Sequence, residues 1–596
     1  MGQRPSRFSL FAVVGLLGCG GGAISDPYPH PMSSSEAPTA RPPTAGSGVL
    51  TPSAGSGGSG ASAAPAAGTY AAAGAGANSP SNPATSGTLP ARIRRLTNAE
   101  FDTSVKALLC VESTFGASFT PDTRQSSFTR NDAQRVDPVF ITQLDAAAKQ
   151  LATSAVAKLD QLAPCQQAQQ AQQAPDPAAS EACAQQFLAK FVTRAYRRPA
   201  TPRELAALLT VYRAGAEGAT YADGIQLTVQ AVLESPAFLY VTEIGPTPLA
   251  PNAQLTDYEL ASAIAYLVTG APPDDALLQA AAAGELQKAE ARKTHATRLL
   301  ANDVAGKQIT RMIEEWLGID RITETAKDST VYPDFAGLRD AMKHEADAFV
   351  SEVMWKRANG VSELLSADWT PAEDGLARMY LGTDQLPARS DGHISLTSVP
   401  RRGILNQGAF LSVYAHAQET APVLRGVAVL RRVVCRNVPP PTSLNINIVP
   451  PVADPSKTTR ERFSIHSKDP ACAACHNQID AIGFTFENLD GMGKARQMEN
   501  GHPIDSATQL KSGFSFDGNY PDSSQLALQL ANSSELTDCF ARNMFRSASA
   551  RNTESEGVEM AFLDSVRNLP SSSQGKFADV LIAFIASDLF SVRRAP

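Results

Sequence analysis

Two cysteines and a histidine lie within five consecutive residues, in the order Cys-x-x-Cys-His: Cys472, Cys475 and His476. Two thiols three residues apart lie one helical turn from each other, so both can form thioethers to the edge of one porphyrin. The histidine that follows is carried under the ring, where its imidazole can ligate the iron from one side. The spacing therefore predicts covalent attachment of one haem c, with His476 as the proximal iron ligand.

Two other chemistries use paired thiols of this kind. A redox dithiol of the thioredoxin type normally follows a strand of a βαβ unit, which the flanking sequence does not resemble. A structural zinc site needs four ligands, usually from two knuckles, and no second knuckle follows this one. Haem attachment is the favoured interpretation, provided that the segment is exported to the compartment where haem is attached.

Several histidines and methionines on either side of the motif are candidates for the sixth coordination position of the iron, and three of them are favoured. Methionine or histidine there suits outer-sphere electron transfer, whereas an open position permits small-molecule chemistry. His466 precedes the motif by six residues, Met492 lies between two glycines in a segment that could swing over the ring, and Met544 has a separation closer to that in small single-haem cytochromes. Each also has an ordinary structural role, because histidine can orient a propionate and methionine fills core gaps.

The N-terminus indicates export. Arg4 and Arg7 precede an apolar run that ends at Leu17-Gly18-Cys19. This arrangement is typical of a bacterial secretory signal peptide, residues 1–19, with a lipoprotein cleavage box that makes Cys19 the lipidated first residue of the mature chain. The alternative is an ordinary signal peptide with a coincidental cysteine.

Residues 20–90 are rich in Gly, Ala, Ser and Pro and carry almost no charge. Such a stretch cannot bury enough apolar surface to offset its ordering entropy, so we expect a flexible tether. No later run of about 18 apolar residues suggests a membrane-spanning helix, which leaves the lipid as the only expected membrane anchor. The expected location is the bacterial cell envelope, either in the periplasm or on the outer surface.

The formal net charge of −7 gives no basic surface, and no stripe of alternating basic and aromatic residues occurs, so nucleic-acid binding is not expected. Five cysteines remain after Cys19 and the motif pair, which fits an oxidising compartment. Cys165 and Cys183 flank a Gln/Ala/Pro-rich loop that a disulfide would close, and we favour that pair. A second pairing, Cys435 with Cys539, would leave Cys110 as a buried thiol, although spacing alone leaves other connectivities open.

Most of the chain after residue 90 has the apolar periodicity of helices, so we expect a mainly α protein. Capping boxes predict helix starts at Thr97 and Thr201, and another capped helix begins in residues 255–260. Between two helices, Arg197 and Arg198 could grip a propionate or phosphate, although such pairs more often bond a neighbouring helix C-terminus. After residue 390, Gly and Pro indicate helices joined by extended proline-rich segments around the haem region. The expected domains are helical at 91–160, 161–245 and 251–385, haem-attaching at 396–500 and helical again at 501–596.

Several of these segments together resemble one family. The chain is similar to the large multi-domain bacterial proteins, of planctomycete and myxobacterial type, that are assembled from consecutive domains of unknown function and end in a cytochrome c-like CxxCH module. The matching segments are residues 95–101 (RLTNAEF), 195–199 (AYRRP), 235–240 (SPAFLY), 255–260 (LTDYEL), 422–426 (PVLRG) and 460–496. One position departs from the family pattern, because Ala481 stands where a proline usually follows Asp480. The resemblance implies a mostly helical, exported, haem-bearing protein, and it implies no particular reaction.

Three functions are compatible with these features. The first is a lipid-anchored, single-haem c-type cytochrome that carries electrons to or from an unidentified redox partner in the envelope. The second is a haem-dependent oxidoreductase whose helical domains bind a polysaccharide-derived or other small substrate, although no catalytic triad, carboxylate pair or phosphate loop supports it. The third is a surface scaffold or adhesion protein in which the haem is structural.

Overall fold

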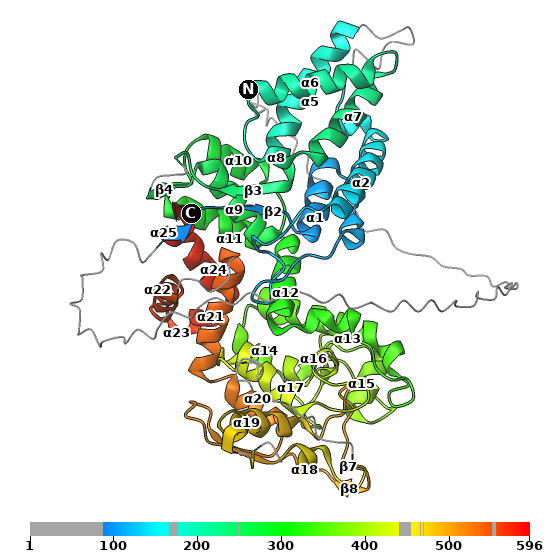
Figure 1. The fold of residues 1–596 in the computed structure, drawn as a ribbon, viewed down its shortest axis with the longest axis vertical. Helices are drawn as coiled ribbons and strands as arrows, with labels where there is room; N and C mark the ends of the chain where they lie inside the picture. The colour runs from blue at the N-terminus through cyan, green and yellow to red at the C-terminus, as the bar shows by residue number, and fades with distance from the viewer. Residues whose placement is uncertain are drawn as a thin grey trace, which may run out of the picture. The chain divides into compact units, whose positions relative to one another are not determined.

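The computed structural model describes residues 88–165, 177–247, 251–439, 454–464, 467–468, 470–550 and 556–595. Residues 84–596 form one compact unit, and the fold is mainly helical, as the sequence predicts (Figure 1). Cys19, the expected tether up to residue 87, His466 and the proline-rich residues 440–453 lie outside the described residues. Within the described ranges, no helix is both long and apolar enough to cross a membrane.

The first part of the fold is a helical layer with its own hydrophobic core. Helices α2 and α6 both pack against α7, and the buried side chains of Phe101, Phe140 and Val229 belong to this core. Its elements are β1 (Leu89–Pro90), β2 (Arg92–Arg95), α1 (Asn98–Leu109), η1 (Phe115–Ser118), α2 (Pro138–Val156), α3 (Leu159–Leu162), α5 (Pro177–Tyr196), α6 (Pro202–Ala216), α7 (Tyr221–Glu234), α8 (Pro236–Leu239) and β3 (Tyr240–Glu243).

A second, larger core holds the rest of the described chain together, from α9 to the C-terminal helices. Its first elements are β4 (Asn252–Gln254), α9 (Asp257–Thr269), α10 (Asp275–Ala282), α11 (Ala289–Leu300), α12 (Asp303–Leu317), η2 (Ile319–Glu324), α13 (Phe335–Val350), η3 (Ser351–Lys356), α14 (Val361–Ser366), β5 (Trp369–Thr370), α15 (Asp374–Leu381) and β6 (Ile394–Ser395). Its later elements are η4 (Ile404–Asn406), α16 (Gly408–Val413), α17 (Pro422–Ala428), η5 (Val429–Val433), α18 (Thr459–Phe463), α19 (Pro470–Gly483), η7 (Phe484–Phe486), β7 (Met498–Glu499), β8 (His502–Pro503), β9 (Thr508–Leu510), β10 (Gly518–Tyr520), α20 (Ser523–Leu530), α21 (Ser534–Ser549), α22 (Glu556–Arg567), α23 (Ser571–Gln574), α24 (Phe577–Ala586), α25 (Asp588–Ser591) and β11 (Val592–Arg594).

The predicted helix starts are confirmed. The side chains of Thr97, Thr201 and Thr256 each accept a hydrogen bond from the backbone of a glutamate three residues later, and each glutamate bonds back to the cap. Each box satisfies backbone donors that the first helical turn would otherwise leave unpaired. Three helices, α1, α6 and α9, therefore begin where local sequence chemistry fixes them.

A small sheet joins the two ends of the described chain. Strand β11 pairs in parallel with β1 and antiparallel with β4. Next to this sheet, the buried carboxylate of Glu243 on β3 accepts from Arg593 Nε at 3.0 Å and is paired with Arg92 on the other side. Truncating one member of such a buried set would leave an uncompensated charge, so the C-terminal segment is an integral part of the fold.

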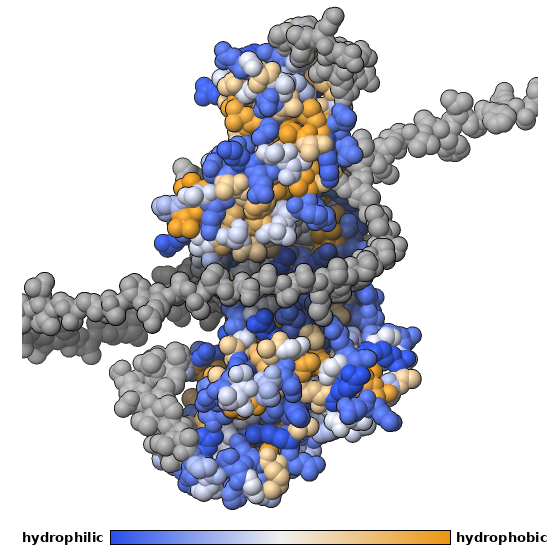
Figure 2. All heavy atoms as spheres, turned by 90° about the vertical axis from the view of Figure 1, so that its right-hand side faces the viewer, coloured by the Kyte–Doolittle hydropathy of each residue, from blue (hydrophilic) through white to orange (hydrophobic). Residues whose placement is uncertain are grey.

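The face drawn in Figure 2 is mostly hydrophilic, and its apolar areas are most evident in the upper half. Val139 and Ile141 at the start of α2 and Leu227 on α7 are among the exposed large apolar side chains. Scattered apolar residues of this kind are ordinary on a folded protein.

Candidate cofactor site on helix α19

Helix α19 carries all three residues of the motif. It begins at Pro470, a residue that suits the first turn of a helix, and ends at Gly483. Cys472 and Cys475 are free thiols of intermediate exposure, and His476 follows them on the same helix. The structure therefore presents two reduced, reachable thiols one turn apart with an imidazole beside them, which is the donor set that a covalently bound haem requires.

A buried carboxylate holds the imidazole of His476. Nδ1 lies 2.9 Å from Oδ1 of Asp480, one turn further along α19, and the side chain of Asp480 is only 3% exposed. Ser467 donates to the other carboxylate oxygen at 2.9 Å. A carboxylate accepts, so Nδ1 carries the hydrogen, and a histidine in that tautomer uses Nε2 to ligate a metal. In the sequence Asp480 stands out only as a match to the family pattern, although its i+4 spacing from His476 signals this contact.

Two glycines allow α19 to lie directly on α17. A Cβ atom placed on Gly426 would lie 2.1 Å from the carbonyl oxygen of Ile479, and one placed on Gly483 would lie 2.0 Å from that of Pro422. Real Cβ atoms do not approach backbone oxygens so closely, and the obstacle on each side is backbone rather than a movable side chain. The position of the motif helix thus depends on the absence of a side chain at both residues.

Arg425 on α17 fixes the chain that follows α19. Its side chain is fully buried and donates to the carbonyl oxygens of Leu489 at 3.0 Å and Asp490 at 2.6 Å, with a further bond to Phe486 at 3.2 Å. Burial lowers the pKa of Arg425 to about 10, so the guanidinium stays charged at neutral pH. Because its partners are backbone carbonyls, the arginine acts as a clamp on residues 486–490.

A second set of polar contacts braces the same loop. Glu487 accepts from Thr420 Oγ1 at 2.8 Å and from Arg496 Nη2 at 2.9 Å, and its carboxylate is almost completely buried. Burial raises the pKa of Glu487, while the two arginines near it act in the opposite direction. Thr420, Glu487 and Arg496 therefore tie the segment before α17 to the loop after α19.

The methionine candidates for the sixth ligand both lie in the protein core. Met492 is 4% exposed and lines a cavity of about 700 Å³ together with residues of α13 and α15. Met544 is 2% exposed on α21, a helix that packs against η5, α14, α22 and α24. Helix α19 packs against α17, η7 and β9. Their role as iron ligands stays a prediction, as does that of His466.

The structure contains the two disulfides that the sequence favours. Cys165 is bonded to Cys183, and Cys435 to Cys539, with Cα atoms 5.7 Å and 5.2 Å apart. The expectation of a buried side chain at Cys110 is wrong, because this cysteine is exposed at the end of α1. Its helix ends there in a left-handed turn, which turns the side chain out of the core. The Cys435–Cys539 bond closes a segment of 104 residues that contains the whole of α19.

We expect the Cys435→Ala/Cys539→Ala variant to lose more stability than the Cys165→Ala/Cys183→Ala variant. The loops that these disulfides close differ in length, 104 against 18 residues. Loop-closure entropy then predicts losses of about 5 and about 3 kcal/mol respectively. Chemical denaturation of the exported proteins measures both, and an equal or reversed order would contradict the chain-entropy explanation.

Comparison with known protein families agrees with this architecture of consecutive helical segments. Four models of proteins of unknown function match in order: PSD3 (DUF1587) at residues 94–157, PSD5 (DUF1595) at 183–243, PSD4 (DUF1592) at 255–381 and PSCyt3 (DUF1588) at 401–499. The chain is therefore one of the multi-domain proteins assembled from consecutive domains of unknown function, and it includes a domain of the PSCyt type. No curated protein and no solved structure matches it.

Proposed function

We propose that the protein is a c-type cytochrome that holds one haem on α19 and transfers electrons to or from another protein of the cell envelope. The observation that carries the proposal is the geometry of α19, where two free thiols one turn apart precede a histidine backed by a buried carboxylate. The matched PSCyt3 model spans this helix, and its printed name agrees with a cytochrome-like domain.

Under this proposal, each residue of the site has a separate structural or ligating role. Cys472 and Cys475 attach the porphyrin, and His476 ligates the iron while Asp480 holds its ring in one orientation. The haem, when bound, supplies one-electron redox chemistry at the iron. Arg425 and the two glycines keep α19 and the following loop in place, so that little rearrangement accompanies a change of charge at the site.

The test is an absorption spectrum of the full chain, expressed with its own signal and a c-type maturation system, together with a pyridine haemochrome assay. We expect one covalent haem per chain and sharp bands in the reduced protein. Exported and folded protein without haem would overturn the proposal. Haem reduction that needs a second protein supports electron transfer, whereas reduction by a small substrate in the purified protein alone supports the oxidoreductase alternative.

Replacing Asp480 by asparagine is expected to raise the reduction potential. The anionic partner makes the imidazole of His476 a stronger donor and thereby favours the oxidised iron, and asparagine keeps the shape without the charge. A loss of 10- to 100-fold in affinity for ferric iron relative to ferrous iron corresponds to a rise of about 60–120 mV for one electron. Potentiometric titration of both haem-loaded proteins measures this difference in reduction potential.

The matched control is Asp505→Asn. Asp505 belongs to the same region, but its side chain is 67% exposed, where it pairs with Arg460 and accepts from the backbone nitrogen of Ala507. A solvated charge of this kind should leave the potential nearly unchanged. Equal shifts in the Asp480 and Asp505 variants would show that Asp480 acts through general electrostatics and not through His476.

We further propose that Cys19 carries a lipid that anchors the protein in the envelope, a residue that lies outside the described part of the chain. Support comes from the apolar run and the small residue before Cys19. A Cys19→Ser variant should move from the membrane fraction to the soluble fraction and lose incorporation of labelled fatty acid. Retention in the membrane with unchanged labelling would contradict the anchor.

A further inference from the structure

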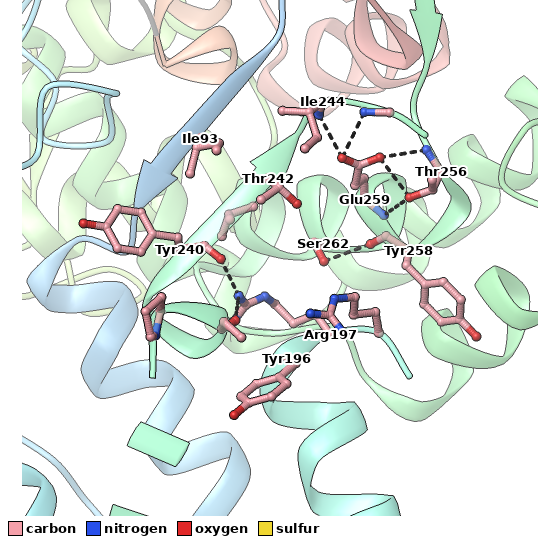
Figure 3. A pocket seen from close by; sticks show the side chains of 15 residues that line it. Ile93, Tyr196, Arg197, Tyr240, Thr242, Ile244, Thr256, Tyr258, Glu259 and Ser262 are labelled. Atoms are coloured by element: carbon pink, nitrogen blue, oxygen red, sulfur yellow. Dashed lines mark hydrogen bonds between the residues drawn. The ribbon is translucent and has the colours of Figure 1, made fainter. Parts of the chain in front are cut away.

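A cavity of about 550 Å³ lies away from α19, where segments from several parts of the chain meet. Figure 3 shows its walls, which come from strands β2 and β3, the turn between α5 and α6, and the start of α9. The segments 195–199, 235–240 and 255–260, which carry the family resemblance, all contribute to it. Two of the matched family models, at residues 183–243 and 255–381, meet here, and ligand sites favour such boundaries.

The charged side chains in the described wall of this cavity are already engaged within the protein. Arg197 donates to the carbonyl oxygens of Tyr240 at 2.7 Å and Ala237 at 2.8 Å. The sequence left open whether this arginine grips an anion, and the structure instead shows it bonded to the backbone around the end of α8. Because these backbone bonds occupy its guanidinium, Arg197 does not provide a binding site for phosphate or carboxylate.

The other two charged side chains in the described wall, Arg198 and Glu259, are also bonded within the protein. Arg198 forms a bidentate pair with Glu204, at 2.8 and 3.0 Å. Glu259 accepts from the backbone nitrogens of Ile244 at 2.8 Å and Gly245 at 3.1 Å and also closes the cap at Thr256. A charged ligand would therefore have to break an existing pair, so the wall favours an uncharged one.

Besides these charged groups, the wall of the cavity contains tyrosine rings, aliphatic side chains and hydroxyl groups. Tyr196, Tyr240 and Tyr258 line the cavity and are drawn on three sides of the view in Figure 3, and Tyr240 and Tyr258 are only half-buried. Ile93, which is 54% exposed, lies opposite Thr242 in the β2–β3 ribbon and adds an apolar surface. A tyrosine offers a flat apolar face with a polar tip, so the wall combines apolar faces with hydrogen-bonding hydroxyls.

We propose that this cavity, the tyrosine pocket, binds a neutral saccharide. A pyranose ring has an apolar face of C–H groups that packs on an aromatic ring, and its edge carries uncharged hydroxyls that can bond to the hydroxyls of Tyr240, Tyr258 and Thr242. The volume lies within the typical range of small-molecule sites, roughly 300–1,000 Å³. This inference is independent of the haem, and it gives the helical domains a binding role beside the electron-transfer role of α19.

The experiment is isothermal titration calorimetry of the purified full chain with cellotetraose, maltotetraose and tetra-N-acetylchitotetraose as neutral probes and trigalacturonic acid as a charged one. We expect at least one neutral probe to bind, and the charged probe to bind at least tenfold more weakly. Absence of binding by all three neutral probes, or preferred binding of the acidic probe, would overturn the proposal.

Substitutions at two positions test whether the saccharide binds in the tyrosine pocket. Tyr258→Ala removes one ring and should weaken binding tenfold or more, whereas Tyr258→Phe keeps the ring and should weaken it less. Ile93→Glu adds a charge at an exposed position, so it should abolish binding without lowering the unfolding midpoint. Leu227→Ala, an exposed apolar position on α7, is the control and should bind as the unchanged protein does. Equal affinities in the tyrosine, isoleucine and leucine variants would show that the saccharide binds elsewhere.

Discussion

Replacing His476 by alanine is expected to abolish the low-spin absorption spectrum of the haem-loaded protein. The imidazole is the only proximal nitrogen that the CxxCH motif supplies, and alanine has no atom that can ligate iron. The structure places this histidine on α19 directly after Cys475 and fixes its ring through Asp480. The measurement is a comparison of oxidised and reduced spectra at equal protein concentration, with the whole low-spin signal expected to disappear.

His502→Ala serves as the matched control, because His502 lies in the same region of the chain but is exposed on strand β8. Its spectrum should equal that of the unchanged protein. A His476 variant with an intact low-spin spectrum would remove this residue as the iron ligand, even if covalent haem were present. If both variants lost the low-spin signal, the cause would be incomplete attachment of the haem and not the loss of an iron ligand.

The sequence could predict those parts of the fold that local chemistry decides. The capping boxes at Thr97 and Thr201 need only residues three positions apart, so their signal is complete within one helical turn. The CxxCH motif is equally local, because its thiols and histidine share one helix. For the same reason the contact between His476 and Asp480 could have been found from the i+4 spacing alone.

Other parts could not be predicted because their partners are distant in the sequence. Arg425 bonds to carbonyl oxygens that lie more than sixty positions further on, and every residue has a carbonyl, so no side-chain pattern identifies them. The pairing of β11 with β1 joins the two ends of the described chain. Arg197 shows the same limit, since its four backbone acceptors decide between a ligand-binding and a structural role and leave no trace in the sequence.

Replacing Gly483 by alanine is expected to destabilise the region around α19 strongly. The new Cβ atom would lie 2.0 Å from the carbonyl oxygen of Pro422, so α17 and α19 would have to separate. Overpacking of a core costs about 1–3 kcal/mol and occasionally more, and a backbone obstacle places this site at the upper end of that range. Gly426→Ala should behave alike, because its Cβ atom would meet the carbonyl oxygen of Ile479 at 2.1 Å. Denaturant unfolding measures the loss, and the yield of covalent haem should fall with it.

The control for this prediction is Gly337→Ala on helix α13. A Cβ atom there meets nothing within 4 Å, and alanine favours a helix over glycine by about 1 kcal/mol, so this variant should be as stable as the unchanged protein or slightly more stable. The three substitutions are chemically identical, and only the space around the new methyl group differs. If Gly483→Ala and Gly426→Ala unfolded at the same denaturant concentration as Gly337→Ala, close contact between α17 and α19 could not be what holds the motif helix in position.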